Sequence, residues 1–273
     1  MTKKKVENLK KIATALRKDV IDISFRANVG HIGSALSIAE IITALYFGIM
    51  SVNPKNPKWK NRDRFILSKG HAAAIQYCAL AKLGFLSREQ LLNFCQNESE
   101  LAEHPEIHVK GVEVTTGSLG HGLSLGVGMA LAGKTKGLNY RVFVLLSDGE
   151  NDEGSVWEAA LAAGHFKLDN LVAIIDYNKL QAFGKIEEVM NLEPLSAKWK
   201  AFGWETSEIS GHDMEKVVRT LEKLPFLKGK PSLIISHSVM GKGISFMEGK
   251  LAWHYQNLKE TEYKRALKEL KDK

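Results

Sequence analysis

The fold of this chain is decided by the stretch Arg141-Val-Phe-Val-Leu-Leu-Ser-Asp-Gly-Glu150. Its continuous apolar run is typical of a parallel strand buried on both faces, and the run leads to a carboxylate. Asp-Gly lets the backbone turn sharply, and the following residues 155–167 have the length and the apolar spacing of a helix. A second apolar run at residues 171–175 then leads to Asp176-Tyr177-Asn178. The pattern predicts a strand, a helix and a second strand.

The two predicted strands bring polar side chains to the same place. Because crossovers between parallel strands are right-handed, their carboxyl ends lie close together at the edge where open α/β sheets bind ligands. Asp148 and Asn178 could each be a routine polar cap, but their spacing with Gly149 favours a shared ion. Hard oxygen ligands suit Mg²⁺, which takes few protein ligands and completes its shell with phosphate oxygens and water. The sequence therefore suggests a site for a Mg²⁺-bound diphosphate.

The rest of the chain continues the α/β alternation and contains no internal repeat. Helices are predicted at about 5–28, 37–47, 72–83, 88–94, 122–134, 155–167, 196–202, 213–224 and 258–271, and strands at 64–67, 142–146, 171–176, 204–209 and 232–236. Such alternation indicates a doubly wound, mainly parallel sheet with helices on both faces. Residues 51–63 and 97–117 are predicted as long loops, which are often functional inside a compact domain.

Length and composition are those of an ordinary cytoplasmic enzyme component. The 273 residues, 44% apolar and 25% charged, suit a single domain spanning residues 1–273. Cys78 and Cys95 form no Cys-x-x-Cys pair and are expected to be reduced. The basic start leads into an amphipathic stretch, so we expect no signal peptide and no membrane partner. The net charge of +7 comes from lysine-rich ends without a basic aromatic stripe, and we therefore expect no nucleic-acid partner.

Several further motifs point to one family. They are Gly30-His31-Ile-Gly33-Ser34, Ser68-Lys69-Gly70-His71, His104-Pro105-Glu106, Thr115-Thr116-Gly117-Ser118-Leu119-Gly120 and Gly241-Lys242-Gly243 with Trp253-His254. Together with the Asp148 turn and Asn178, they resemble the amino-terminal half of transketolases, in their order and at similar separations. The resemblance covers nearly the whole chain. It implies the fold that binds the diphosphate of thiamine diphosphate (ThDP).

The resemblance also implies how the cofactor is held. The metal ion, Mg²⁺ with Ca²⁺ or Mn²⁺ as alternatives, is expected on Asp148, Asn178 and the backbone carbonyl of Leu180. The other expected cofactor-binding residues are His71, Gly117, Ser118, Leu119, Ser147, Gly149, Glu150, Met240 and His254. Gly117 could simply belong to a turn before the next helix, although glycine there also lets the backbone approach a flat ring. The sequence departs from the family at Ser147, where the first glycine of Gly-Asp-Gly is usual.

Four of the nine histidines lie beside Gly, Pro or an aromatic residue in loop-like junctions, where binding residues collect. They are His31, His71, His104 and His254, and the resemblance places them among the family's active-site histidines. Imidazoles suit this chemistry because sugar hydroxyl protons must move near neutral pH. The family usually follows the last histidine with Gly, whereas Tyr255 stands here. The remaining histidines that we interpret as structural are His108, His165, His212 and His237.

Glu153 follows the Asp-Gly turn at the start of the predicted helix. A carboxylate there could simply favour the helix amino terminus. The resemblance instead implies a catalytic role, in which Glu153 faces its symmetry partner and the cofactor-activating glutamate across a dimer interface.

These features together predict the amino-terminal subunit of a split transketolase. Such an enzyme transfers a two-carbon ketol unit from a ketose, or its phosphate, to an aldose, or its phosphate, as in pentose phosphate metabolism. The family's remaining domains are expected on a separate C-terminal subunit, in a dimer of heterodimers. The alternatives are a 1-deoxyxylulose-5-phosphate synthase-like component, the E1 α subunit of a 2-oxo acid dehydrogenase, or a non-catalytic ThDP-binding module. The Gly-His-Ile-Gly and Ser-Lys-Gly-His segments favour transketolase, and the retained histidines argue against a sensor.

Overall fold

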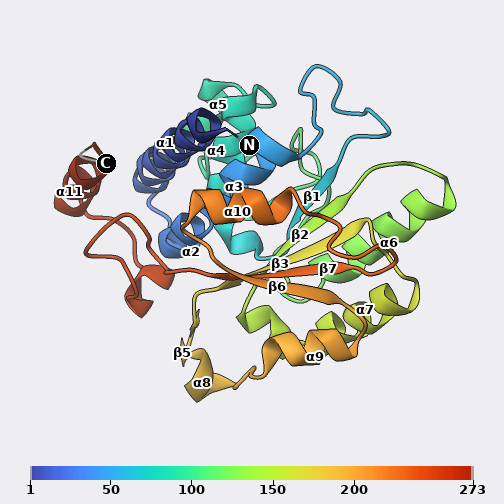
Figure 1. Cartoon of the computed structure of the whole chain (residues 1–273). Coiled ribbons are helices and arrows are strands. Elements are labelled where there is room, and N and C mark those ends of the chain that lie inside the picture. The colour runs from blue at the N-terminus through green and yellow to red at the C-terminus, as the bar shows by residue number, and fades with distance from the viewer. Residues whose placement is uncertain (1, 272–273) are drawn as a thin grey trace.

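The computed structural model describes residues 2–271 and is built around a five-stranded parallel sheet (Figure 1). In spatial order its strands are β1 (Arg64–Leu67), β2 (Val142–Ser147), β3 (Leu171–Tyr177), β7 (Ser232–His237) and β6 (Glu205–Ser210). Every neighbouring pair is parallel. The five strands predicted from the sequence are all present, within one residue at either end, and the predicted fold class is confirmed.

Alternate residues of β1, β2, β3 and β7 enter two different apolar cores, whereas the edge strand β6 contributes only Ile209. In β2, Phe143 and Leu145 belong to one core, whereas Val144 and Leu146 belong to the other. The first core is covered by α1 (Lys3–Ala27), α2 (Ile32–Ser37), α3 (Ala39–Ala44), α4 (Ala73–Leu83), α5 (Arg88–Leu92), α10 (Met214–Leu221) and α11 (Glu260–Lys271). The second is covered by α6 (Gly122–Thr135), α7 (Gly154–His165) and α9 (Leu195–Ala201). This double burial explains why β2, β3 and the apolar parts of β1 and β7 show no polar alternation.

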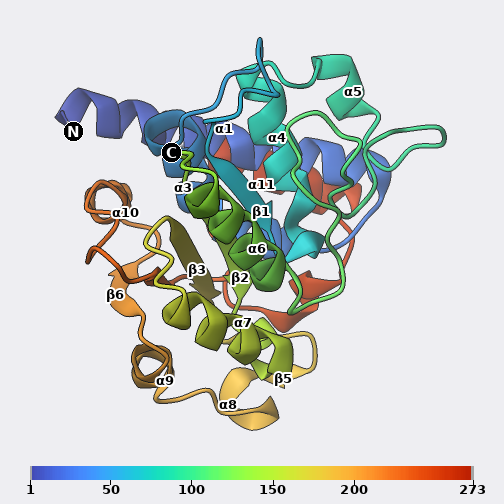
Figure 2. The ribbon, with the colours of Figure 1, turned by 90° about the vertical axis from the view of Figure 1, so that its right-hand side faces the viewer.

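The two helical layers lie on opposite faces of the sheet. Figure 1 shows α1, α3 and α10 above the strands and α7 and α9 below them. Figure 2, turned by 90°, shows α6 and α7 side by side, where they pack on each other. No helix within residues 2–271 is long and apolar enough to span a membrane.

The predicted helix at 37–47 is wrong in its limits. The structure has α2 from Ile32, a break at Ile38 with φ −103° and ψ 11°, then α3, and finally a π-helical turn at Leu45–Ile49. Every residue from 32 to 46 is buried. A segment that is buried all round shows no apolar stripe from which helix limits could be read. The segment after Gly149 also differs, because a 3₁₀ turn at Gly149–Asp152 precedes α7.

The sequence pattern missed a small hairpin that begins just past the carboxyl end of β3. It consists of β4 (Leu180–Gln181) and β5 (Gly184–Lys185) and leads into the short helix α8 (Ile186–Val189). Two-residue strands are too short to produce a periodic pattern. Short 3₁₀ turns at Gly70–Ala72 and Leu251–His254 were missed for the same reason. Residues 51–63 and 97–117 contain no helix or strand, as predicted.

Polar residues collect at the carboxyl edge of the sheet. The register pairs Ser147 of β2 with Asp176 of β3, and Asp176 with Ser236 of β7. Ser68 follows β1 at the same edge, since Leu67 at the end of β1 pairs with Leu145 near the end of β2. The ends of four strands therefore converge where the sequence predicts a ligand site.

Candidate active site

A cavity of about 390 Å³ opens at this edge and gathers motifs that are far apart in the sequence. It brings together most of the predicted site residues, namely His31, His71, Gly117, Leu119, Ser147, Asp148, Gly149, Glu153, Asn178, Leu180 and His254. Its volume lies within the range of ordinary small-molecule sites. We call the part around Asp148 and Asn178 the metal end. The part around His31, His71 and His254, together with the neighbouring His104 ring, is called the histidine end.

At the metal end, the start of the hairpin holds the expected ligands. Asp148 is buried, and its Oδ2 accepts a hydrogen bond from the Lys179 backbone N–H at 2.7 Å. Asn178 Oδ1 accepts one from the Leu180 N–H at 3.0 Å. Lys179 between them has φ +66°, a left-handed conformation that turns the chain sharply. Asp148, Asn178 and Leu180 thus line one cavity, and their metal-binding role remains a prediction.

The electrostatics of Asp148 fit a cation. Burial, and then the neighbouring Asp176 carboxylate, raise the pKa of Asp148 to about 7, although hydrogen bonds from Lys179 and Gly149 oppose the shift. A divalent ion would favour the charged carboxylate. No group of three or more His, Cys, Asp or Glu side chains within residues 2–271 could hold a metal. An ion here would therefore need amide, backbone or phosphate oxygens, as Mg²⁺ bound to a diphosphate does.

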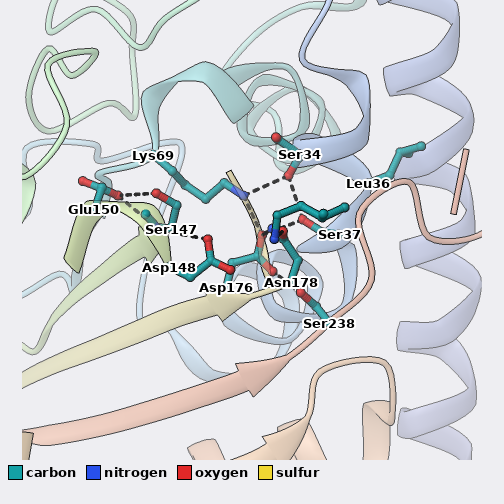
Figure 3. A network of polar contacts seen from close by, with 12 residues as sticks. Ser34, Leu36, Ser37, Lys69, Ser147, Asp148, Glu150, Asp176, Asn178 and Ser238 are labelled. Atoms are coloured by element: carbon teal, nitrogen blue, oxygen red, sulfur yellow. Dashed lines mark hydrogen bonds and ion pairs between the residues drawn. The ribbon is translucent and has the colours of Figure 1, made fainter. Parts of the chain in front are cut away.

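A buried ion pair supports the metal end, as Figure 3 shows. Lys69 Nζ lies 2.6 Å from Asp176 Oδ2, and each side chain is 1% exposed. Ser37 Oγ donates to the same carboxylate at 2.6 Å, and Ser238 donates to its other oxygen. Burial alone would raise the pKa of Asp176, but the Lys69 ammonium holds it below its usual value. The Asp176 carboxylate is therefore charged and fully bonded.

This network fixes the amide of Asn178. Asn178 Nδ2 donates to Asp176 Oδ2 at 3.1 Å, which leaves Oδ1 on the other side of the amide. Neither Lys69 nor Asp176 was predicted as a site residue. One signal could have found them, because each is a charged residue at the end of an apolar strand and buried charges are rarely unpaired.

Glu150 corrects the predicted set of cofactor-binding side chains. It is fully buried, and its carboxylate accepts hydrogen bonds from the Ser147 N–H at 2.8 Å, the Gly120 N–H at 3.0 Å and the Ser68 hydroxyl. It does not line the cavity. The Glu150 side chain is therefore committed to joining the ends of β1 and β2 to the Gly120 turn, and is not available to a cofactor.

The histidine end brings four rings together. The His31 ring centroid lies 5.3 Å from His71, 5.5 Å from His254 and 6.3 Å from His104. His31 has φ +56°, and its backbone N–H donates to the His254 carbonyl at 3.0 Å. His31 Nδ1 also lies 2.9 Å from a carboxylate oxygen of Glu103, a residue that was not predicted. The structure thus assembles the four predicted histidines, while their catalytic role remains a prediction.

Burial favours the neutral form of three of these rings. Burial lowers the pKa of His254 to about 4, with His31 and Lys69 adding to the effect. Burial, and then Lys69, hold the pKa of His71 well below its usual value, and burial also lowers that of His104. His254 Nδ1 is buried without a hydrogen-bond partner within residues 2–271. A neutral ring with an open nitrogen can exchange a hydrogen bond or a proton with a polar ligand.

His104 lies beside the cavity and does not line it, whereas the neighbouring Gly117 does. A Cβ on Gly117 would stand 3.3 Å from His104 Cδ2, so Gly117 allows close approach at the histidine end. Ser118 is exposed and Met240 is buried, and neither lines the cavity. Met240 instead lines a smaller cavity of about 260 Å³ behind the hairpin, together with Asn178 and Leu180. The expected contact of these two side chains with the cofactor thus remains a prediction that the cavity does not support.

The mouth of the cavity carries exposed apolar and acidic groups. Phe183 at the tip of the hairpin is 88% exposed, and Tyr255 is 60% exposed while its ring lies 5.3 Å from His31. Glu153 is exposed at the amino terminus of α7 and makes no capping hydrogen bond with its side chain in the described chain. A Cβ on Gly120 would lie 2.6 Å from Glu153 Cβ, which keeps Glu153 against the Gly120 turn.

Comparisons with known proteins identify the family of this chain. The family model described as "Transketolase, thiamine diphosphate binding domain" matches residues 8–271. One subunit of the apulose-4-phosphate transketolase of Phocaeicola vulgatus is 47% identical over 268 residues, which are 98% of this chain and 95% of that protein. The 6-deoxy-6-sulfo-D-fructose transketolase subunit SqwG of Clostridium sp. is 44% identical over 94% of each protein.

Longer relatives match over only part of their length. Mouse transketolase is 39% identical over 97% of this chain but 42% of the mouse protein. The crystal structure of Campylobacter jejuni transketolase superposes with a TM-score of 0.92 at 35% identity, covering 99% of this chain and 43% of that one. These matches confirm the resemblance carried by the motifs and favour it over the other ThDP enzymes considered. The chain belongs to the transketolase family, as its thiamine diphosphate-binding domain, and it corresponds to the amino-terminal subunit of split transketolases.

Proposed function

We propose that this chain is the ThDP-binding subunit of a transketolase that transfers a two-carbon ketol unit from a ketose, or its phosphate, to an aldose, or its phosphate. The observation that carries the proposal is a single cavity with an oxygen-ligand cluster at one end and three histidines at the other, beside which lies the ring of a fourth, His104. Two ends of this kind are what a diphosphate cofactor and a polyhydroxylated substrate together require.

The metal end would hold the cofactor. Asp148, Asn178 and the Leu180 carbonyl would bind Mg²⁺, for which Ca²⁺ or Mn²⁺ could substitute, and the ion would hold the diphosphate. The Lys69–Asp176 pair would keep the Asn178 amide oriented toward the ion. When bound, ThDP supplies the electron sink for breaking the bond between C2 and C3 of the ketose.

The histidine end would handle the sugar. His31, His71 and His104 would hydrogen-bond to sugar hydroxyl groups, and a neutral ring could accept a hydroxyl proton and later return it. His254 Nδ1, which has no partner within residues 2–271, would accept or donate a hydrogen bond to the cofactor or the substrate. Burial of these rings keeps water from competing for the same protons.

A second subunit would complete the site. The chain spans about two fifths of mouse transketolase, and Phe183 and Tyr255 leave apolar surface exposed at the cavity mouth. We propose that a C-terminal transketolase subunit covers this mouth in a cytoplasmic dimer of heterodimers, working in pentose phosphate or related sugar metabolism. Glu153 at the mouth would then face the interface.

The test is ketol transfer from a ketose phosphate to an aldose. The chain is assayed alone, free of co-purifying protein, and again after adding the candidate C-terminal subunit. We expect no turnover by the chain alone and recovery at a one-to-one subunit ratio, whereas the Asp148→Ala chain should not recover. Substantial turnover by the isolated wild-type chain would contradict the proposed division of the active site.

A further inference from the structure

A second cavity of about 310 Å³ lies at the opposite end of β1. Its residues include Asp63, which immediately precedes the strand, whereas the first cavity contains Lys69, which follows it. The two cavities share no lining residue. None of the motifs that define the proposed ThDP site contributes a side chain to this second cavity.

The inner wall of the second cavity is aromatic. Tyr46, Phe65 and Phe85 line it and are each at most 7% exposed, and the Tyr46 and Phe65 rings meet edge to face at 5.3 Å. Burial holds the pKa of Tyr46 well above its usual range, so its hydroxyl stays neutral. Apolar rings of this kind suit a flat or branched apolar body.

The charge at the rim is positive. Asp63 is neutralised by Arg141 at 2.6 Å, and Glu113 by Arg62 at 2.9 Å, so both acidic groups of the lining already have partners. Lys58 and Lys110 also line the cavity, and neither makes a hydrogen bond or an ion pair through its side chain within residues 2–271. Two exposed lysines at the edge of a cavity with an aromatic inner wall favour a ligand with an anionic head and an apolar body.

One wall of this cavity belongs to a loop that reaches the histidine end. Residues 107–113 form the wall, and the base of the loop is closed by the Thr116 N–H donating to the Pro105 carbonyl at 3.1 Å. The Ile107 N–H also donates to Thr115 Oγ1 at 3.0 Å. His104 and Gly117 immediately flank this closed base. Movement of the wall would therefore act on Gly117 of the first cavity and on His104 beside it.

We propose that the second cavity binds a small organic anion with an apolar ring or branched aliphatic body, and that its occupancy alters the environment of His104 through residues 105–116. The proposal does not rest on the proposed function, because neither ThDP, nor sugar, nor a second subunit is needed to test it. Its ligand class follows from the aromatic inner wall and the two lysines alone.

The probe is 8-anilinonaphthalene-1-sulfonate, an aromatic sulfonate whose fluorescence rises on apolar binding. It is titrated into the full chain with and without Mg²⁺-ThDP. Lys58→Glu/Lys110→Glu removes the positive rim, and Lys136→Glu/Lys228→Glu makes the same charge change at exposed lysines outside the cavity. Val112→Trp fills the cavity from its half-buried wall, and circular dichroism checks that each variant is folded.

We expect saturable binding that Mg²⁺-ThDP does not displace. Charge reversal at Lys58 and Lys110 should weaken it at least about tenfold relative to the control pair, since two favourable charge contacts become repulsive. Val112→Trp should abolish it. Equal affinity in wild type, the charge-reversed variant and Val112→Trp would overturn the binding site.

The proposed effect of the second cavity on His104 is measured separately. The Cε1–H resonance of His104, assigned with His104→Gln, should shift when the probe binds to the wild-type chain and should not shift in Val112→Trp. A shift of the same size in both proteins would show that the probe acts elsewhere. Binding with the expected variant dependence but without any His104 shift would overturn the coupling to the histidine end.

Discussion

The metal end and the histidine end of the cavity are built differently. Asp148 and Asp176 are each 1% exposed and stand at the carboxyl ends of adjacent central strands, where Lys69, Ser37 and backbone N–H groups bond to them. The four histidines stand on turns and loop junctions, and His254 has an open nitrogen within the described chain. The polar groups of the metal end are already paired, whereas the histidine end has a ring nitrogen that can still form a hydrogen bond to a ligand.

This difference suits two different tasks. A site that must hold a multiply charged group benefits from side chains fixed beforehand, because no reorganisation is then needed on binding. A site that must exchange protons with successive substrates benefits from neutral rings whose nitrogens are free. Changes at the metal end should therefore alter binding and stability, and changes at the histidine end should alter turnover.

The largest effect is expected at the histidine end. Replacing His31, His71 or His104 by Ala should lower turnover of the reconstituted enzyme by roughly 10²–10⁴-fold if the ring is a true acid or base, with little change in Tm. His237→Ala is the control, since His237 is exposed and pairs with Glu208 away from the cavity. A variant that keeps full turnover with several ketose donors would show that the replaced histidine is structural and not catalytic.

The next effect concerns stability at the metal end. Lys69→Met leaves the Asp176 carboxylate buried without its cation, which should lower the free energy of unfolding by about 3–5 kcal/mol in urea titrations. Lys134→Met breaks a partly exposed pair with Asp169 at a similar distance of 2.7 Å and should cost at most about 1 kcal/mol. Adding Asp176→Asn to Lys69→Met should recover part of the loss. Equal losses of unfolding free energy for Lys69→Met and Lys134→Met would contradict the view that the metal end is held by a buried ion pair.

The sequence predicted most of the fold because most of its strands contain continuous apolar runs that are separated by segments of helical length. Most of the residues predicted for the site, chiefly through the family resemblance that the motifs carry, line the cavity. Lys69 and Glu103 were missed as site residues because their partners, Asp176 and His31, are more than 70 positions away and only the folded chain joins them. The break at Ile38 was missed because helices buried on every side show no stripe.

Glu150 is the opposite case, a predicted site residue whose side chain does not line the cavity. Its place beside Asp148 and Gly149 made it a candidate for cofactor binding, yet its carboxylate is enclosed by Ser68, Gly120 and the Ser147 backbone. Adjacency in a turn says little about side-chain direction, because successive residues of a 3₁₀ turn point to different sides. Most of the candidate residues therefore line one cavity, while the Glu150 side chain lies outside it.

A smaller effect is expected for cofactor affinity. Asp148→Ala removes the only carboxylate assigned to the ion, so ThDP affinity in Mg²⁺ should fall at least about tenfold, or about 1.4 kcal/mol. Calorimetric titration with the partner subunit present measures it. Asp152→Ala is the matched control, because Asp152 lines the same cavity but is exposed and bonds to Gln181. Equal ThDP affinity in wild type and Asp148→Ala would contradict the assignment of Asp148 as a ligand of the metal ion.

The smallest effect tests whether a hydrogen bond to a carboxylate fixes the orientation of a ring at the histidine end. His31 Nδ1 lies 2.9 Å from a carboxylate oxygen of the partly exposed Glu103, which links the imidazole ring to a carboxylate. Glu103→Gln keeps the shape and a neutral hydrogen bond, so kcat/KM should fall about fivefold, the difference of about 1 kcal/mol between charged and neutral hydrogen bonds. Glu100→Gln, an exposed change in the same loop, should have no effect. A loss as large as that of His31→Ala would mean that the histidine end is as tightly organised as the metal end.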